Sequence, residues 1–95
     1  PSQMIHVMNP ENWREEYAFR APGLRVHGLA WAIDGRLWAA DTLAGTICLL
    51  DSTSGRVYDV ARVEAPTEVH GMTIHEGVLW YCHDTTCDIG RLLLE

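Results

Sequence analysis

The chain has 95 residues, of which 47% are hydrophobic and 21% charged, and its formal net charge is −6. This length allows at most one domain, and an acidic chain with seven scattered Lys and Arg residues argues against nucleic acid or an anionic membrane surface as a partner. No apolar run approaches the roughly 20 residues of a membrane span, and no signal-peptide pattern opens the chain. These features favour a small globular protein.

Three cysteines are present, Cys48, Cys82 and Cys87. An odd number without a secretion signal favours reduced thiols and a cytoplasmic location. We interpret residues 1–3 and 94–95 as remnants of cloning and leave them out of the fold argument.

Short apolar or alternating runs separated by turn residues dominate the chain, and no long window has helical periodicity. This pattern predicts an all-β fold. Asp34-Gly35 is a strong hairpin turn, because both residues tolerate positive φ, and Glu76-Gly77 is expected to form a similar turn. In chain order, the expected strands cover residues 4–8, 15–19, 27–33, 36–40, 46–50, 56–63, 70–74, 78–82 and 89–93.

An internal repeat organises this strand pattern. The stretch HGLAWAIDGRLWAAD, from His27 to Asp41, recurs in altered form as HGMTIHEGVLWYCH, from His70 to His83. The two His-Gly pairs lie 43 residues apart. A repeat of this length is the sequence signature of a propeller blade or a solenoid unit.

The repeat divides one unit, residues 4–93, into two blades. Residues 27–63 predict a complete four-stranded blade, and residues 70–93 predict a second blade without its fourth strand. Residues 4–22 align with the third and fourth strands of a blade and supply what the second blade lacks. The sequence therefore predicts a permuted pair of four-stranded β-propeller blades.

Two blades cannot bury their apolar faces alone, because a repeat array usually needs at least three units for a continuous core. The open strand edges at both ends also invite pairing with another chain. Propellers contain four to eight blades, so closure by homo-oligomerisation would remove both problems. We expect the protein's main partner to be itself, with a homotrimer of six blades favoured.

Three consecutive motifs carry a resemblance to known proteins. HGLAW, DGRLWAAD and TICLLD together are similar to a blade of the NHL and SMP-30 propellers, of virginiamycin-lyase-like proteins and of the lyase domain of peptide-amidating enzymes. Known members are mostly single chains of five to seven blades, so a two-blade chain departs from them. The two-blade layout also resembles small trimeric fucose-binding lectins, although their motifs are absent.

His27 and His70 open the first strands, which line the central channel of a propeller. Imidazole suits zinc and related divalent metals, and three His ligands with an open fourth position form the catalytic zinc arrangement. The resemblance also implies a metal site at these residues, because the amidating-lyase domain holds a metal through His residues of several blades. Both residues are candidate metal ligands, although a His-Gly pair can also cap a loop without metal.

Asp41 and His83 end the second strands on the same face, where they could act as general bases or orient ligands. An aspartate in this position can equally hold loop backbone amides. The remaining residues around this face and the channel are candidates for substrate binding: Arg25, Glu68, Asp84 and Trp31.

These residues predict a metal-dependent hydrolase or lyase that acts on a small molecule at the channel mouth. The alternative is a lectin-like or metabolite-binding module without catalysis, with pockets between blades built from Trp and acidic residues. A third interpretation is part of a larger propeller, or an assembly unit without a site of its own.

Overall fold

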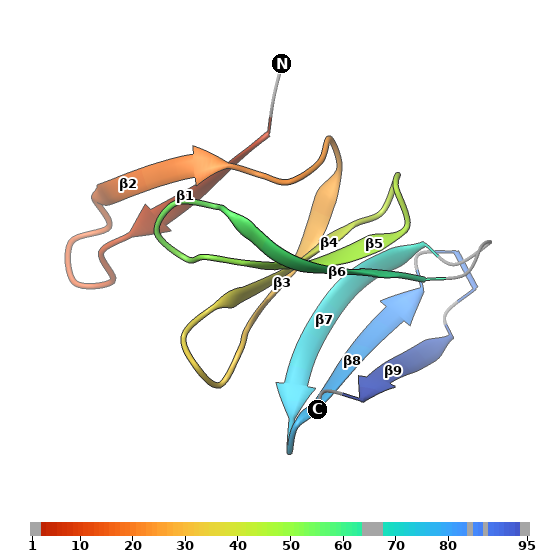
Figure 1. Ribbon diagram of the computed structural model, residues 1–95. Coiled ribbons are helices and arrows are strands. Elements are labelled where there is room, and N and C mark those ends of the chain that lie inside the picture. The colour runs from red at the N-terminus through yellow and green to blue at the C-terminus, as the bar shows by residue number, and fades with distance from the viewer. Residues whose placement is uncertain (1–2, 64–67, 84, 87, 94–95) are drawn as a thin grey trace.

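The computed structural model describes residues 3–63, 68–83, 85–86 and 88–93. In this part of the chain, nine strands form three antiparallel sheets, and none of the described segments is a helix able to cross a membrane (Figure 1). All nine strands expected from the sequence are confirmed, with ends shifted by no more than two residues. The strands are β1 (Met4–Met8), β2 (Glu15–Arg20), β3 (Val26–Trp31), β4 (Leu37–Asp41), β5 (Thr46–Leu50), β6 (Val57–Arg62), β7 (Val69–His75), β8 (Val78–His83) and β9 (Ile89–Leu93).

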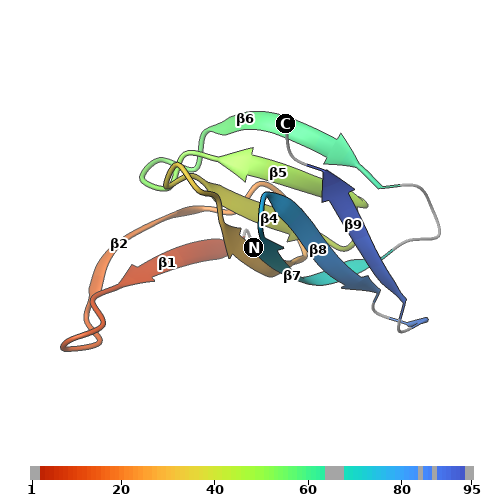
Figure 2. The same cartoon turned by 90° about the horizontal axis from the view of Figure 1, so that it is seen from below.

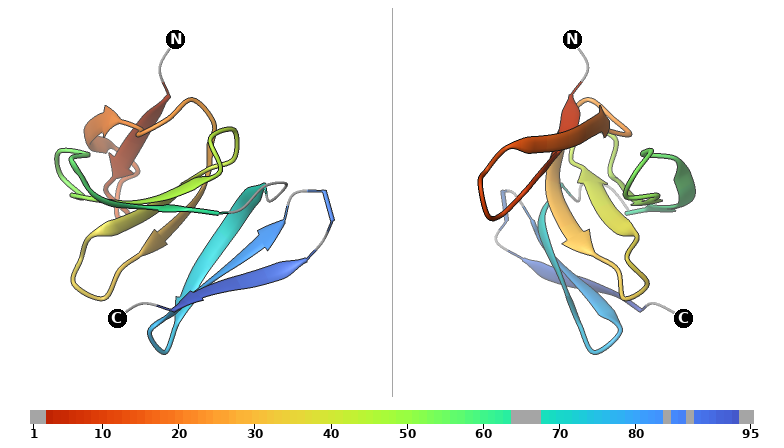
Figure 3. Two further views of the ribbon diagram at one scale, coloured as in Figure 1. Left: turned by 45° about the vertical axis from the view of Figure 1, so that its right-hand side comes forward. Right: turned by 90° about the vertical axis from the view of Figure 1, so that its left-hand side faces the viewer.

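The three sheets follow one another face to face in chain order. β1–β2 form the N-terminal sheet, β3–β4–β5–β6 the central sheet, and β7–β8–β9 the C-terminal sheet. Figures 2 and 3 show the central sheet lying between the other two. The described strands divide into groups of two, four and three, which are the groups expected for residues 4–22, 27–63 and 70–93. Within the chain, β1 and β2 pair with each other and do not join β7–β9.

The central sheet buries both of its faces. Side chains alternate along β4, so that Leu37 and Ala39 pack against the N-terminal sheet while Trp38 and Ala40 pack against the C-terminal sheet. β5 alternates in the same way and contributes the fully buried Ile47. Burial of such an aliphatic side chain contributes about 1.5–3 kcal/mol to stability.

The N-terminal sheet repeats the geometry of β5–β6. Met4 pairs with Arg20 as Thr46 pairs with Arg62, and both hairpins have a register irregularity one residue before the turn. The turn hydrogen bonds also match, from Trp13 N–H to the Asn9 carbonyl (2.8 Å) and from Gly55 N–H to the Asp51 carbonyl (2.9 Å). The two hairpins therefore occupy the same place in successive repeats, as third and fourth strands.

Candidate functional site

His27 and His70 meet where the central and C-terminal sheets adjoin. Each is the second residue of the first strand of its sheet, and these strands, β3 and β7, lie side by side (Figure 1). Nδ1 of His27 lies 2.5 Å from Nε2 of His70, with the ring centroids 4.4 Å apart and the ring planes at 80°. A neutral imidazole has one N–H and one acceptor nitrogen, so one ring donates this hydrogen bond and the other accepts it.

The glycine after His27 explains how the two strands approach so closely. A Cβ atom on Gly28 would lie 2.3 Å from the backbone oxygen of His70, which is far inside van der Waals contact. Only glycine therefore leaves room for the second His backbone at this distance. The His-Gly motif brings the two imidazoles together through its glycine.

Asp41 anchors the loops beside the pair. Its side chain is buried, one carboxylate oxygen accepts the backbone N–H of Leu24 at 3.1 Å, and the other accepts that of Ala44 at 2.9 Å. Gly23 permits this contact, because a Cβ atom there would lie 1.5 Å from the carboxylate. Both oxygens are engaged by loop backbone, which is the structural role that the sequence left open beside the catalytic one.

Thr42 is a polar residue of this region that the sequence analysis missed. Its buried hydroxyl donates to the backbone carbonyl of Val69 at 2.6 Å. This bond joins the loop after β4 to the residue before His70, so it helps to fix where β7 begins. The sequence feature that could have indicated Thr42 is its position in the polar Asp41-Thr42 pair, directly after an apolar strand.

His83 ends β8 and pairs in register with Val69, beside His70. Its Nδ1 atom is buried and has no hydrogen-bond partner among the described residues. A buried polar nitrogen without a partner is costly, so a group supplied from outside this part of the chain would stabilise it. The neighbouring Asp84 lies outside the described residues.

The other candidate residues divide between the two ends of the strands. Arg25 and Glu68 precede β3 and β7, at the same end as the histidine pair. The carbonyl of Arg25 accepts the backbone N–H of Thr42 at 3.0 Å. Trp31, 64% exposed, lies at the opposite end of β3, roughly 13 Å from His27 along the strand at about 3.3 Å per residue. The structure therefore separates Trp31 from the histidine pair.

The histidine pair supplies part of a metal site. Two imidazole nitrogens are suitable donors for zinc or a related ion, but catalytic zinc has three protein ligands. The described residues contain no group of three or more His, Cys, Asp or Glu side chains arranged to hold a metal. His27 and His70 fit two of the ligand positions, and any third must come from other residues.

A groove of about 640 Å³ opens at the other end of the strands, between the central and C-terminal sheets. Its walls carry Trp38, Leu49 and Leu92, and Tyr58 and Asp59 contribute polar atoms. The volume lies in the range of small-molecule sites. This groove corresponds to the inter-blade pocket of the binding-module hypothesis.

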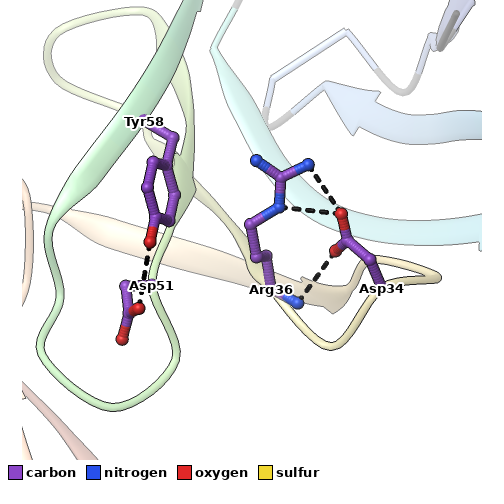
Figure 4. A network of polar contacts seen from close by, with 4 residues as sticks. All are labelled: Asp34, Arg36, Asp51 and Tyr58. Atoms are coloured by element: carbon purple, nitrogen blue, oxygen red, sulfur yellow. Dashed lines mark hydrogen bonds and ion pairs between the residues drawn. The ribbon is translucent and has the colours of Figure 1, made fainter.

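A polar network borders this groove (Figure 4). Arg36 donates to Asp34 through Nε at 2.8 Å, and this pair lowers the pKa of Asp34 and raises that of Arg36. The Arg36 guanidinium also lies 5.3 Å from the ring centroid of Tyr58, whose hydroxyl donates to Asp51 at 3.1 Å. These contacts hold the Tyr58 ring in place at the edge of the groove.

Comparison with solved structures identifies the fold. The chain is similar to a streptogramin B lyase, with a TM-score of 0.61 and 26% identity over 72% of this chain and 23% of that one. It also matches the β-propeller domain of Cps50 (Swd1) from Myceliophteria thermophila, with a TM-score of 0.61, 18% identity and coverage of 98% and 33%. A third match is virginiamycin B lyase from Staphylococcus aureus, with a TM-score of 0.54, 15% identity and coverage of 99% and 31%.

This chain has the repeat architecture of a β-propeller. Its three sheets are successive blades or parts of blades, and the chain spans 23% to 33% of the length of the propellers that it matches. No protein-family model matches the sequence, and no curated protein matches it either.

Proposed function

We propose that this protein is a metal-dependent lyase or hydrolase that acts on a small molecule at the mouth of a propeller channel. The observation that carries the proposal is the 2.5 Å approach of His27 Nδ1 to His70 Nε2, between the first strands of successive blades. Nitrogens this close can turn toward one shared ion with little movement, because two ligands of one zinc ion lie about 3.3 Å apart at bond lengths near 2.0 Å.

The likeness to a lyase supports the same reaction class. The streptogramin B lyase is 26% identical over 72% of this chain, and virginiamycin B lyase shares the fold. The NHL and SMP-30 propellers, whose blade motifs the sequence resembles, are the family that we propose for it. Because fold alone does not determine function, the histidine pair remains the main support.

The remaining ligands would come from further blades around the axis, and copies of this chain in a trimer are our proposed source. A bound divalent ion supplies Lewis acidity and lowers the pKa of its water. His83 is a better candidate than Asp41 for a general base or a group that orients a ligand, because the buried Nδ1 of His83 lacks a partner among the described residues. Asp41 holds the loops around the site, and we propose that Arg25 and Glu68 contact the substrate.

Zinc content measured on the purified protein tests this proposal. We expect His27→Ala and His70→Ala each to reduce zinc affinity by at least about tenfold, because even the loss of a group that only orients a metal ligand costs about 10- to 100-fold. His75→Ala is the matched control, since His75 is exposed at the other end of β7. Unchanged zinc content in both substituted proteins would overturn the proposal.

The groove favours a second candidate, a metal-independent binding module. Its apolar walls, with the aromatic Trp38 and Tyr58 and the acidic Asp59, suit a small glycan or an amphipathic metabolite. Such a ligand would raise the melting temperature equally with and without chelator. We expect His27→Ala to preserve this shift and Tyr58→Ala to reduce it. No shift across a panel of small glycans would count against this function.

A further inference from the structure

The outer face of the N-terminal sheet carries a row of side chains that the metal proposal above does not use. Three residues of β1, at every second position, are exposed on this face: Met4, His6 and Met8. We propose that these three residues form a binding site for a soft, singly charged metal ion, copper(I). The site shares no ligand with the histidine pair and is tested separately from it.

Strand geometry places the three side chains in one row. Successive side chains of a strand point to opposite faces, so every second residue shares a face and lies roughly 6.6 Å from the next, at about 3.3 Å per residue. The intervening Ile5 and Val7 pack in the core between the N-terminal and central sheets, so the row faces outward. The register irregularity near Met8 leaves the row intact, because the extra residue lies in β2.

Glu15 prepares the His6 imidazole to bind a metal. Nδ1 of His6 contacts a carboxylate oxygen of Glu15 on the neighbouring strand. A carboxylate that accepts one ring N–H fixes the tautomer and the ring orientation, which is the usual arrangement behind a metal-bound histidine. The other nitrogen, Nε2, is then the ligand atom, and the His6 side chain is 56% exposed, so an ion can approach it from solvent.

The surroundings of His6 leave room for the two thioethers. The residue that pairs with His6 across the sheet is Ala18, whose side chain is only a methyl group. Methionine is unbranched and has three rotatable bonds, and Met4 and Met8 are 41% and 40% exposed. Their sulfur atoms can therefore turn toward Nε2 of His6 from its two sides along the strand.

The ligand types select the metal. Thioether sulfur is a soft ligand that favours copper(I), and imidazole also binds copper, whereas zinc takes thiolate, imidazole and carboxylate ligands. All three proposed ligands are uncharged. This suits a singly charged ion on a face where Arg20, which pairs with Met4, already balances the charge of Glu15. The site therefore differs from the histidine pair in its metal as well as in its position.

Methyl NMR of methionine during an anaerobic copper(I) titration of the whole chain tests the site. The chain has three methionines, and the third, Met72, packs between the central and C-terminal sheets as an internal control. We expect the methyl signals of Met4 and Met8 to shift together over the first equivalent, in the wild type and in His27→Ala alike. Signals that stay in place, or that shift only together with that of Met72, would overturn the proposal.

Competition with a chromogenic copper(I) chelator measures the affinity. Met4→Leu and Met8→Leu nearly conserve side-chain volume and should each weaken copper(I) binding by about tenfold or more. Met72→Leu is the matched control and should have no effect. Glu15→Ala should weaken binding by about 10- to 100-fold, and Glu15→Gln should recover most of this loss, because its amide oxygen still accepts the N–H of His6 Nδ1.

Equal affinities of the wild type and both β1 leucine variants would overturn the proposal. If Glu15→Gln binds as weakly as Glu15→Ala, the positioning role of Glu15 is wrong. Circular dichroism checks that each variant is folded. Because none of the substitutions in β1 or β2 removes a nitrogen of the histidine pair, zinc affinity and copper(I) affinity report separately on the two metal proposals.

Discussion

Asp51 illustrates how one side chain closes a turn of this repeat. One of its oxygens accepts the backbone N–H of Thr53 at 2.8 Å, that of Ser54 at 2.9 Å and the Thr53 hydroxyl at 2.6 Å. The other accepts the hydroxyl of Tyr58. These donors favour the ionised form, the Thr53 hydroxyl most strongly, and hold the pKa of Asp51 well below its usual range.

The low pKa of Asp51 predicts a specific acid sensitivity. A carboxyl whose pKa is depressed by folding stabilises the folded state above its unfolded value, about 3.9. That contribution is lost as the pH falls from about 4 through the folded pKa. Thermal unfolding at several pH values should therefore show a smaller decrease in melting temperature between pH 5 and pH 2 for Asp51→Asn than for the wild type. Parallel pH profiles would contradict the role of the charge.

Asp41 and Trp31 show what residue type alone leaves undecided. An aspartate at a strand end suits catalysis and loop anchoring equally well, and the buried contacts of Asp41 with two loop amides became visible only in the structure. Trp31 is a candidate for substrate binding as an aromatic residue of the predicted first strand, but it lies at the end of β3 opposite His27. Whether a residue belongs to the site therefore depends on its position along the strand and on its contacts, which residue type alone does not specify.

At the scale of strands and turns, Gly28 controls how closely two blades meet. We expect Gly28→Ala to destabilise the protein by about 1–3 kcal/mol, the usual cost of overpacking, because the new Cβ atom would lie 2.3 Å from the His70 oxygen. Gly71→Ala is the matched control, since its Cβ atom would lie 3.3 Å from the Cys82 sulfur. Denaturant unfolding measures both.

The outcome that would contradict this interpretation is a Gly71→Ala protein destabilised as much as Gly28→Ala. The strands would then not be closest at the first His-Gly pair. A decrease in the free energy of unfolding of less than about 0.5 kcal/mol for Gly28→Ala would also contradict it. Such a small effect would mean that the backbone of β7 can move away from the new Cβ atom at little energetic cost.

The turn between β1 and β2 contains a strained tryptophan. Trp13 has a φ of 58° and is 74% exposed, in the turn position where the matching hairpin has Gly55 with a φ of 78°. Left-handed backbone costs a non-glycine residue about 1–2 kcal/mol. Trp13→Gly relieves this strain, but glycine also makes the unfolded chain more flexible, which offsets part of the gain. We therefore expect a net increase of about 0.5–1 kcal/mol in the free energy of unfolding, measured by denaturant titration.

Trp13→Ala separates backbone strain from loss of the indole ring. Alanine keeps the Cβ atom and should gain little stability, so the gain should be specific to glycine. Equal stability of the two variants would show that the turn relaxes around a side chain without strain.

The strands themselves followed from the sequence because alternation and turn residues are local signals. β4 and β5 have apolar side chains on both faces, which already indicated a sheet covered on two sides. The contacts between sheets, such as that of Thr42 with Val69, join residues 27 positions apart and have no local pattern. The division of the strands into groups of two, four and three, in contrast, follows the repeat expected from the sequence, because only consecutive strands pair.

At the scale of the whole molecule, one packing step relates each sheet to the next. The N-terminal sheet packs on the central sheet as the central sheet packs on the C-terminal sheet, with equivalent positions buried at each step. Repetition of this step turns the first strands toward a common edge, where His27 and His70 meet. The histidine pair is therefore a product of the repeat, and further blades would extend it.

The central claim is that the repeat makes His27 and His70 a joint ligand pair. Nitrogen-15 NMR of the imidazoles during zinc titration tests it most directly. We predict that Nδ1 of His27 and Nε2 of His70 shift together at one stoichiometry, while the exposed His75 is unaffected. Independent shifts of the two residues, or a response of His75 equal to theirs, would contradict the claim.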